Sequence, residues 1–159
     1  MNRKDKDPQA PEAEMRASRA WLTRAREAVG KTPQDFGEFV GGASNYYDLE
    51  AFDGELYTVL SLAEVSRLCS ALAIRPRELF DNGRTEGLTI SPEQLLFKAK
   101  DYMKRNNLSV AELSERIGFE IGPSLEDSAN VLEWNVDFLR WLCDEIGLDW
   151  LLALPESAA

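Results

Sequence analysis

Seven hydrogen-bonding side chains in two neighbouring segments are the residues of this sequence best suited to chemistry. An asparagine amide can form two hydrogen bonds with adenine, and serine, tyrosine or lysine side chains can bond to phosphates or base edges. This set has the hydrogen-bonding groups needed to contact DNA; the alternative is that a tyrosine belongs to the core and that Ser44 only caps a helix. In chain order the set is Lys31, Thr32, Gln34, Ser44, Asn45, Tyr46 and Tyr47.

The sequence offers few side chains for catalysis or for metal binding. The chain has no histidine and only two cysteines, so a Ser–His or Cys–His nucleophile pair and a four-ligand Cys/His zinc site are both excluded. Cys69 and Cys143 each lie in an apolar helical pattern, which is typical of buried small side chains. The carboxylates Glu112 and Glu115 fit an ordinary solvated helix face, and no glycine-rich phosphate loop occurs. We expect no enzymatic activity, no metal and no cofactor.

The length of 159 residues allows one ordinary domain or two very small ones. No run of 18 apolar residues predicts a membrane span, and the charged start Met-Asn-Arg-Lys lacks the apolar stretch of a secretory signal. We therefore expect a cytoplasmic protein that contacts no membrane.

The formal net charge of −10 is unfavourable for a nucleic-acid binder, because neutralising phosphates supplies much of the affinity. The charge is unevenly distributed, since residues 21–80 carry six basic and nine acidic side chains, whereas residues 91–159 carry six and thirteen. Positive charge for DNA would come from Lys31 and from Arg16, Arg19 and Arg24, with further basic residues in 1–6. The front of the chain is thus the part that tolerates a polyanion.

Helical patterns follow one another along the chain. Residues 1–15 are charged and nearly free of apolar side chains, which predicts a disordered tail. Helical periodicity starts near Arg16, and Ser61-Leu-Ala-Glu64 is a capping box before another helix. The polar, turn-rich stretch 83–90 predicts a linker, after which Ser91-Pro-Glu-Gln94 starts a new helix.

Two blocks of sequence recur in the same order. Residues 31–41 align with residues 108–118: in both, a capping Thr or Ser precedes a short helix that ends at Gly. Residues 67–74 align with residues 141–148, where the Leu-Cys pair recurs in register. We expect a duplicated unit, the alternative being that two amphipathic helices can be aligned by chance.

The first unit resembles the lambda-repressor-like, or xenobiotic-response-element, helix-turn-helix family. The resemblance rests on Arg26, Gly30-Lys-Thr32, Phe36, Gly41, Leu49-Glu50 and the stretch from Ser61 to Phe80. It implies five helices, with helices two and three forming the DNA-reading motif, and an ion pair between Arg26 and Glu50 that clamps helix one to helix three. It therefore implies an all-α fold of two tandem five-helix helix-turn-helix domains, residues 16–82 and 91–155.

Both units depart from the family pattern. Pro33 stands where the family usually has a phosphate-contacting Gln, for which Gln34 is a substitute. In the second unit Met103 replaces the clamp arginine, and the expected reading helix, 124–133, is acidic and lacks a basic residue. A polyanion would be repelled by such a helix. We expect the second unit to have kept the scaffold and lost the reading function.

The C-terminal part of the second unit has more apolar residues than one buried face of a helix can hold. An aromatic set there predicts an interface with the first unit or with another subunit, and a homodimer would suit symmetric DNA half-sites. We thus expect a sequence-specific, DNA-binding regulator of transcription; the alternative is an acidic protein-interaction module, such as an antiactivator or co-regulator, on the same scaffold. The aromatic set is Trp134, Phe138, Trp141 and Trp150.

Overall fold

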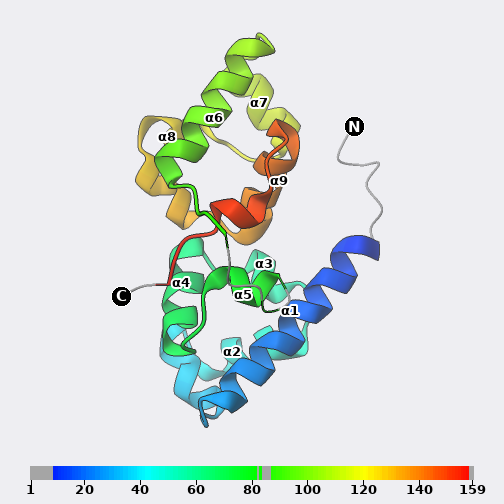
Figure 1. The fold of residues 1–159 in the computed structure, drawn as a ribbon, viewed down its shortest axis with the longest axis vertical. Helices are drawn as coiled ribbons and strands as arrows, with labels where there is room; N and C mark the ends of the chain where they lie inside the picture. The colour runs from blue at the N-terminus through cyan, green and yellow to red at the C-terminus, as the bar shows by residue number, and fades with distance from the viewer. Residues whose placement is uncertain (1–8, 82, 84–86, 158–159) are drawn as a thin grey trace.

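The structure, a computed structural model, describes residues 9–81, 83 and 87–157, and the regular elements in this part of the chain are all helical. The expected all-α class is confirmed. The first half of the chain forms one lobe and the second half forms the other, stacked along the long axis in Figure 1. The first lobe contains α1 (Gln9–Ala28), the 3₁₀ helix η2 (Pro33–Phe39), α2 (Ala43–Ala51), α3 (Glu55–Thr58), α4 (Leu62–Ala71) and α5 (Pro76–Phe80). The second contains α6 (Pro92–Arg105), α7 (Val110–Ile117), α8 (Gly122–Glu126), the 3₁₀ helix η3 (Ser128–Glu133), α9 (Val136–Ile146) and the 3₁₀ helix η4 (Trp150–Ala153).

The expected disordered tail is wrong for residues 9–15, which form the first turns of α1, while residues 1–8 lie outside the described part. This stretch contains good helix formers, and Glu12 opposes the helix dipole in the first turn. Tertiary contacts also hold it, because Met15 packs against the core and Glu14 lies 3.4 Å from the guanidinium of Arg140 in the second lobe.

Local capping signals set several helix starts as the sequence predicted. At α4 the Glu64 amide donates to the Ser61 hydroxyl at 3.1 Å, and the Ser61 amide donates back to the Glu64 carboxylate at 3.0 Å. Ser91 and Gln94 make the same reciprocal pair at α6. Ser44, by contrast, lies inside α2, whose N-cap is Gly42.

The two lobes share one hydrophobic core. Trp150 of η4 packs against the rings of Tyr57 and Phe80, with centroid distances of 6.4 and 5.7 Å. The Leu62 amide donates to the Trp134 carbonyl at 2.7 Å across the junction. The predicted linker 83–90 includes residues outside the described part, but its end is packed, since the Ile90 amide donates to the Leu152 carbonyl at 2.8 Å.

The aromatic set lies mainly within the chain, and one of the two expected interfaces, that with the first unit, is present. Trp134 is buried and donates its indole N–H to the Ser124 hydroxyl at 2.9 Å. Phe138 stacks on Phe119 at 4.3 Å, and Trp141 lies against Phe138. Of the two alternatives, contact with the first lobe holds for Trp150. Trp134, Phe138 and Trp141 thus find ring or side-chain partners within the second lobe, and the ring of Trp150 packs between the two lobes.

The last described residues return to the first lobe. The Ser66 hydroxyl donates to the Glu156 carbonyl at 2.5 Å, and the Glu156 carboxylate pairs with Arg75 at 2.6 Å. The Ser157 hydroxyl donates to the Ile74 carbonyl at 2.6 Å. Residues 155–157 thus tie the C-terminal end of the second lobe to α4 and α5.

Candidate nucleic-acid interface

Helices η2 and α2 are joined by a tight turn at the end of the first lobe away from the second (Figure 1). Gly37 permits this approach, because a Cβ built on it would lie 2.7 Å from the Ala43 backbone nitrogen. The turn runs through Gly41 and Gly42, whose φ angles of +84° and +137° suit residues without a Cβ. The short η2–α2 unit is therefore held by backbone contact as well as by side chains.

A bidentate ion pair holds α2 to α1. The Arg26 guanidinium donates to both carboxylate oxygens of Glu50, at 2.8 and 3.1 Å, and a third N–H donates to the Lys31 carbonyl at 2.9 Å. Both charged side chains are largely covered, with 15% and 12% of their surface exposed. The hydrogen bond with Glu50 raises the pKa of Arg26 above its ordinary value. The structure therefore contains the Arg26–Glu50 ion pair that the family resemblance implied.

Tyr46 is not available to DNA, and its inclusion among the contact residues was wrong. It is fully buried and stacks on Phe36 with a ring-centroid distance of 5.5 Å. Burial raises the pKa of Tyr46, so its phenol stays protonated. Because consecutive helical residues point about 100° apart, Tyr47 faces outward and half of its surface is exposed.

Ser44, Asn45 and Tyr47 are the predicted residues that α2 presents to solvent. The Asn45 side-chain amide donates to the Val40 carbonyl at 3.0 Å, which fixes its rotamer across the turn. Beside them, Lys31, Thr32 and Gln34 are also exposed. Six of the seven predicted residues are thus exposed on two adjoining segments, at the start of η2 and along α2.

Most of the charge around this surface is negative. Asp35, Glu38 and Asp48 are exposed on η2 and α2, against the single lysine Lys31. The backbone and hydroxyl of Thr32 donate to the Asp35 carboxylate at 2.8 and 3.1 Å, and these bonds lower the pKa of Asp35. The carboxylate therefore stays ionised and caps η2.

The arginines expected to supply positive charge are largely engaged elsewhere. Arg16 and Arg19 lie 3.5 and 3.0 Å from the carboxylate oxygens of Asp53. Arg19 also donates to the Ala51 carbonyl at 2.6 Å and so holds the C-terminal end of α2, a role that the sequence did not indicate. Arg24 lies over the ring of Trp21 at 5.0 Å. The basic residues of segment 1–6 lie outside the described part.

The corresponding region of the second lobe cannot present one reading helix. The expected helix 124–133 is divided into α8 and η3, with Asp127 between them in extended backbone. Ser124 is buried under Trp134, and the exposed side chains include Glu126 and Asp127. The break and the acidic residues both oppose insertion into a DNA groove.

The remaining observations concern other kinds of site. Within residues 9–81, 83 and 87–157, no group of three or more His, Cys, Asp or Glu side chains could hold a metal ion. None of the helices described is both long and apolar enough to cross a membrane. The chain matches no protein-family model, and no curated protein or solved structure matches it either.

Proposed function

We propose that this chain is a DNA-binding regulator that reads its site with the N-terminal end of α2. Two tandem helix-turn-helix units of the lambda-repressor-like type would account for the shared order of elements in the two lobes. In each, a long helix precedes three shorter segments and a further helix: α1, η2, α2, α3 and α4 in the first, and α6, α7, α8, η3 and α9 in the second. The first unit would read DNA and the second would serve as scaffold.

The observation that carries this proposal is the way α2 is held. Its apolar residues Tyr46 and Leu49 are buried, the Arg26–Glu50 pair fixes it to α1, and Ser44, Asn45 and Tyr47 point outward. A recognition element needs rigid support on one side and hydrogen-bonding side chains on the other. Asn45 is the strongest candidate for base contact, because its rotamer is already fixed while its amide oxygen has no bond to the protein within the described part.

Because few basic side chains are exposed near α2, we expect the chain to make few contacts with DNA phosphates. Few phosphate contacts give weak non-specific affinity and a shallow dependence on salt, with a log–log slope of about −0.9 for each phosphate neutralised. Discrimination between sequences would then rest on α2. Selection from random 30-base-pair duplexes at about 50 mM salt, where phosphate contacts are little screened, is the direct test.

The variant pair Asn45→Ala/Tyr47→Ala should remove the sequence preference and leave the fold intact, as checked by circular dichroism. A matched control is Asn106→Ala, because Asn106 is exposed and its amide also donates to a carbonyl, that of Tyr102, at 2.9 Å. If the wild-type chain enriches no sequence, or if the control loses the preference equally, the proposal fails.

A second candidate function is supported by the carboxylates on the same surface. Asp35, Glu38 and Asp48 beside one lysine would suit a basic protein partner, which the helix-turn-helix would bind and restrain. Asp48→Arg separates the two functions. The substitution should tighten DNA binding about tenfold if α2 lies against phosphates, and it should weaken capture of a basic protein partner if α2 binds one. Charge reversal at Glu126 and Asp127 tests the acidic second lobe for the same protein-binding role.

A further inference from the structure

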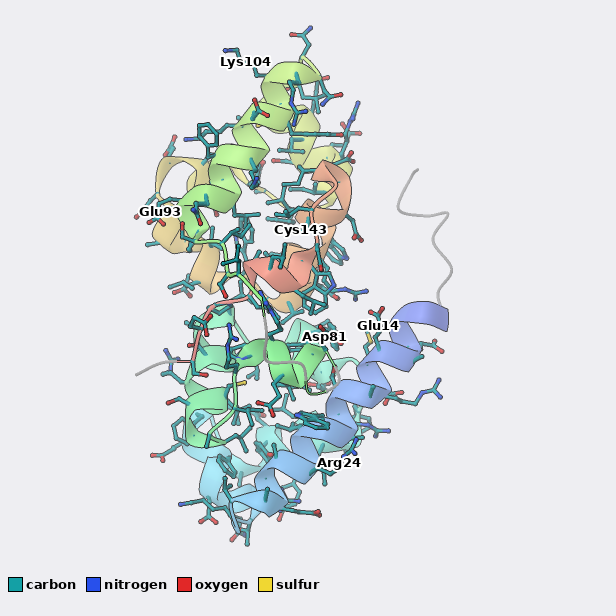
Figure 2. The ribbon with its side chains drawn as sticks, viewed as in Figure 1. Glu14, Arg24, Asp81, Glu93, Lys104 and Cys143 are labelled. Carbon is teal, nitrogen blue, oxygen red and sulfur yellow. The ribbon has the colours of Figure 1, made fainter. Side chains whose placement is uncertain are left out.

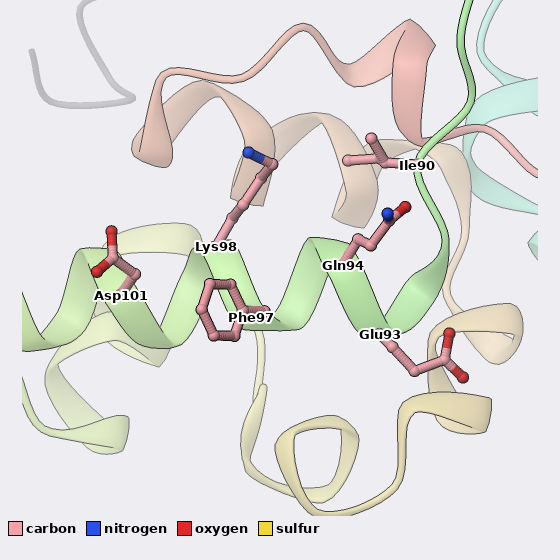
Figure 3. A pocket seen from close by; sticks show the side chains of 6 residues that line it. All are labelled: Ile90, Glu93, Gln94, Phe97, Lys98 and Asp101. Atoms are coloured by element: carbon pink, nitrogen blue, oxygen red, sulfur yellow. The ribbon is translucent and has the colours of Figure 1, made fainter.

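The outer face of α6 carries a large apolar side chain with nothing packed over it. Phe97 is 72% exposed, whereas Leu95, Leu96 and Ala99 on the opposite side of the same helix are buried. Figure 3 shows Phe97 beside an open groove of about 670 Å³. The groove is lined by Ile90, Glu93, Gln94, Phe97, Lys98 and Asp101.

The exposed face of α6 is acidic near its N-terminal end and carries lysines toward its C-terminal end. Glu93 lies in the first turn, and Lys100 and Lys104 lie in the second half of the helix; Figure 2 labels Glu93 and Lys104 near its opposite ends. Neither lysine forms an ion pair within the part of the chain that the structure describes. Glu93 accepts a hydrogen bond from the Ser128 hydroxyl at 3.1 Å, and the pKa of Glu93 is lowered by hydrogen bonding, so the carboxylate is ionised at neutral pH.

The spacing of these charges fits an antiparallel copy of the same helix. Residues 93, 100 and 104 are separated by seven and four positions, so they share one side of the helix. If two copies of α6 cross antiparallel at Phe97, Glu93 lies level with Asp101 of the other copy, which is already paired with Arg105 at 2.9 Å. The Glu93 carboxylate then also lies near Lys100 and Lys104 of that copy, and the two-fold axis repeats the arrangement.

We propose that the α6 face is a homodimer interface, in which Phe97 of each copy enters the groove beside Phe97 of the other. This contact is isologous, with an aromatic centre and a charged rim, as in many protein interfaces. It does not depend on DNA binding. It replaces the aromatic set of the second half as the location of the expected dimer contact, because those rings are mostly covered within the chain.

A polyanion is a poorer occupant for the same lysines. The chain has a net charge of −10, and Glu93 and Asp101 lie on the face itself. Asp101 also pairs with Arg105 at 2.9 Å, which removes a further cation from the set. A second copy of the chain offers partners to both the lysines and the carboxylates of this face. A nucleic acid would pair with the lysines only, and its phosphates would repel the carboxylates.

The expected dimer is weak. A helix of 14 residues is about 21 Å long, so this contact covers less than the ~800 Å² per partner of a standard interface. We expect a dissociation constant on the order of 10–100 μM, as for small transient interfaces. Sedimentation velocity from about 5 to 300 μM protein spans that range.

Three variants test the geometry by sedimentation. Phe97→Asp should raise the dissociation constant at least tenfold, and Glu93→Lys should raise it severalfold. The triple variant Glu93→Lys/Lys100→Glu/Lys104→Glu reverses both sides of each pair and should regain most of the wild-type association. Val59→Asp is the matched control, because Val59 is an exposed apolar residue of the first lobe, half of whose surface is accessible.

A cysteine at the proposed two-fold axis gives an independent measurement. Phe97→Cys should form an intermolecular disulfide under mild oxidation, whereas Val59→Cys should not. The native Cys69 and Cys143 are both buried and do not interfere. A wild-type monomer up to 300 μM, an unchanged association in Phe97→Asp, or a triple variant no better than Glu93→Lys would overturn the proposal. So would binding of a 20-base-pair duplex by Lys100 and Lys104 without any dimer.

Discussion

Removing both partners of the Arg26–Glu50 pair should cost about as much as removing one of them. In Glu50→Leu the Arg26 guanidinium, only 15% of whose side-chain surface is exposed, would lie beside an apolar side chain. It would also lose two of its three hydrogen bonds. Charged hydrogen bonds contribute about 1.5–3 kcal/mol, and breaking a buried pair costs about 3–5 kcal/mol. Because this pair is only partly buried, we expect a loss of about 2–3 kcal/mol in the free energy of unfolding.

The double-mutant cycle separates pairing from burial. Arg26→Met should cost a similar amount, since it leaves the Glu50 carboxylate, 12% exposed, without the guanidinium. The double variant Arg26→Met/Glu50→Leu replaces the pair by apolar contact and should recover at least half of the summed loss. A coupling free energy of about 2 kcal/mol is therefore expected, well above the ~0.5 kcal/mol scatter of independent sites.

Urea unfolding followed by tryptophan fluorescence measures this directly. With a slope of about 2 kcal/mol per molar urea, each single variant should lower the midpoint by about 1–1.5 M at an unchanged slope. The urea midpoint of Arg26→Lys should be close to that of Arg26→Met rather than to that of the wild type, because an ammonium cannot form the bidentate pair. Additive single variants would refute the conclusion that this pair holds α2 to α1.

Three other measurements test separate parts of the structure. Gly37→Ala should lower the melting temperature by several degrees because its Cβ would meet the α2 backbone, whereas Gly54→Ala, with open space around it, should change little. Hydrogen bonds from Arg75 and Thr89 lower the pKa of Glu156, so its contribution to stability is present above the unfolded pKa and lost as pH falls through the folded one. The free energy of unfolding of the wild type, from urea titrations, should therefore drop more than that of Glu156→Gln between pH 6 and pH 3, by less than about 1 kcal/mol because the site is exposed. Burial raises the pKa of Cys143 to about 12, so its thiol should resist a disulfide reagent at pH 8 in the native protein and react fully in urea.

Features that depend on a few consecutive residues were predictable from the sequence. The capping boxes at Ser61 and Ser91, the glycine breaks at Gly30 and Gly41, and the all-helical class each follow from hydrogen bonds closed within one or two turns. The Arg26–Glu50 pair spans 24 residues, and it was found through a family resemblance rather than from local chemistry.

The direction in which a helical side chain points required the tertiary structure. Tyr46 and Tyr47 are adjacent and identical in type, yet one is fully buried and the other half exposed, because a helix turns by about 100° per residue and its register depends on its neighbours. A tertiary contact also helps to hold residues 9–15, because Glu14 lies 3.4 Å from the guanidinium of Arg140, which is 126 residues away in the sequence.

Sequence periodicity determined which segments become helices, because the backbone bonds that form a helix are local. The tertiary structure alone decided what the apolar residues face. The aromatic set of the second lobe is largely satisfied within the chain, with Trp150 against the first lobe, whereas Phe97 on α6 has no partner at all in the part described. Burial depends on which surfaces meet, and residues far apart in the sequence settle that together.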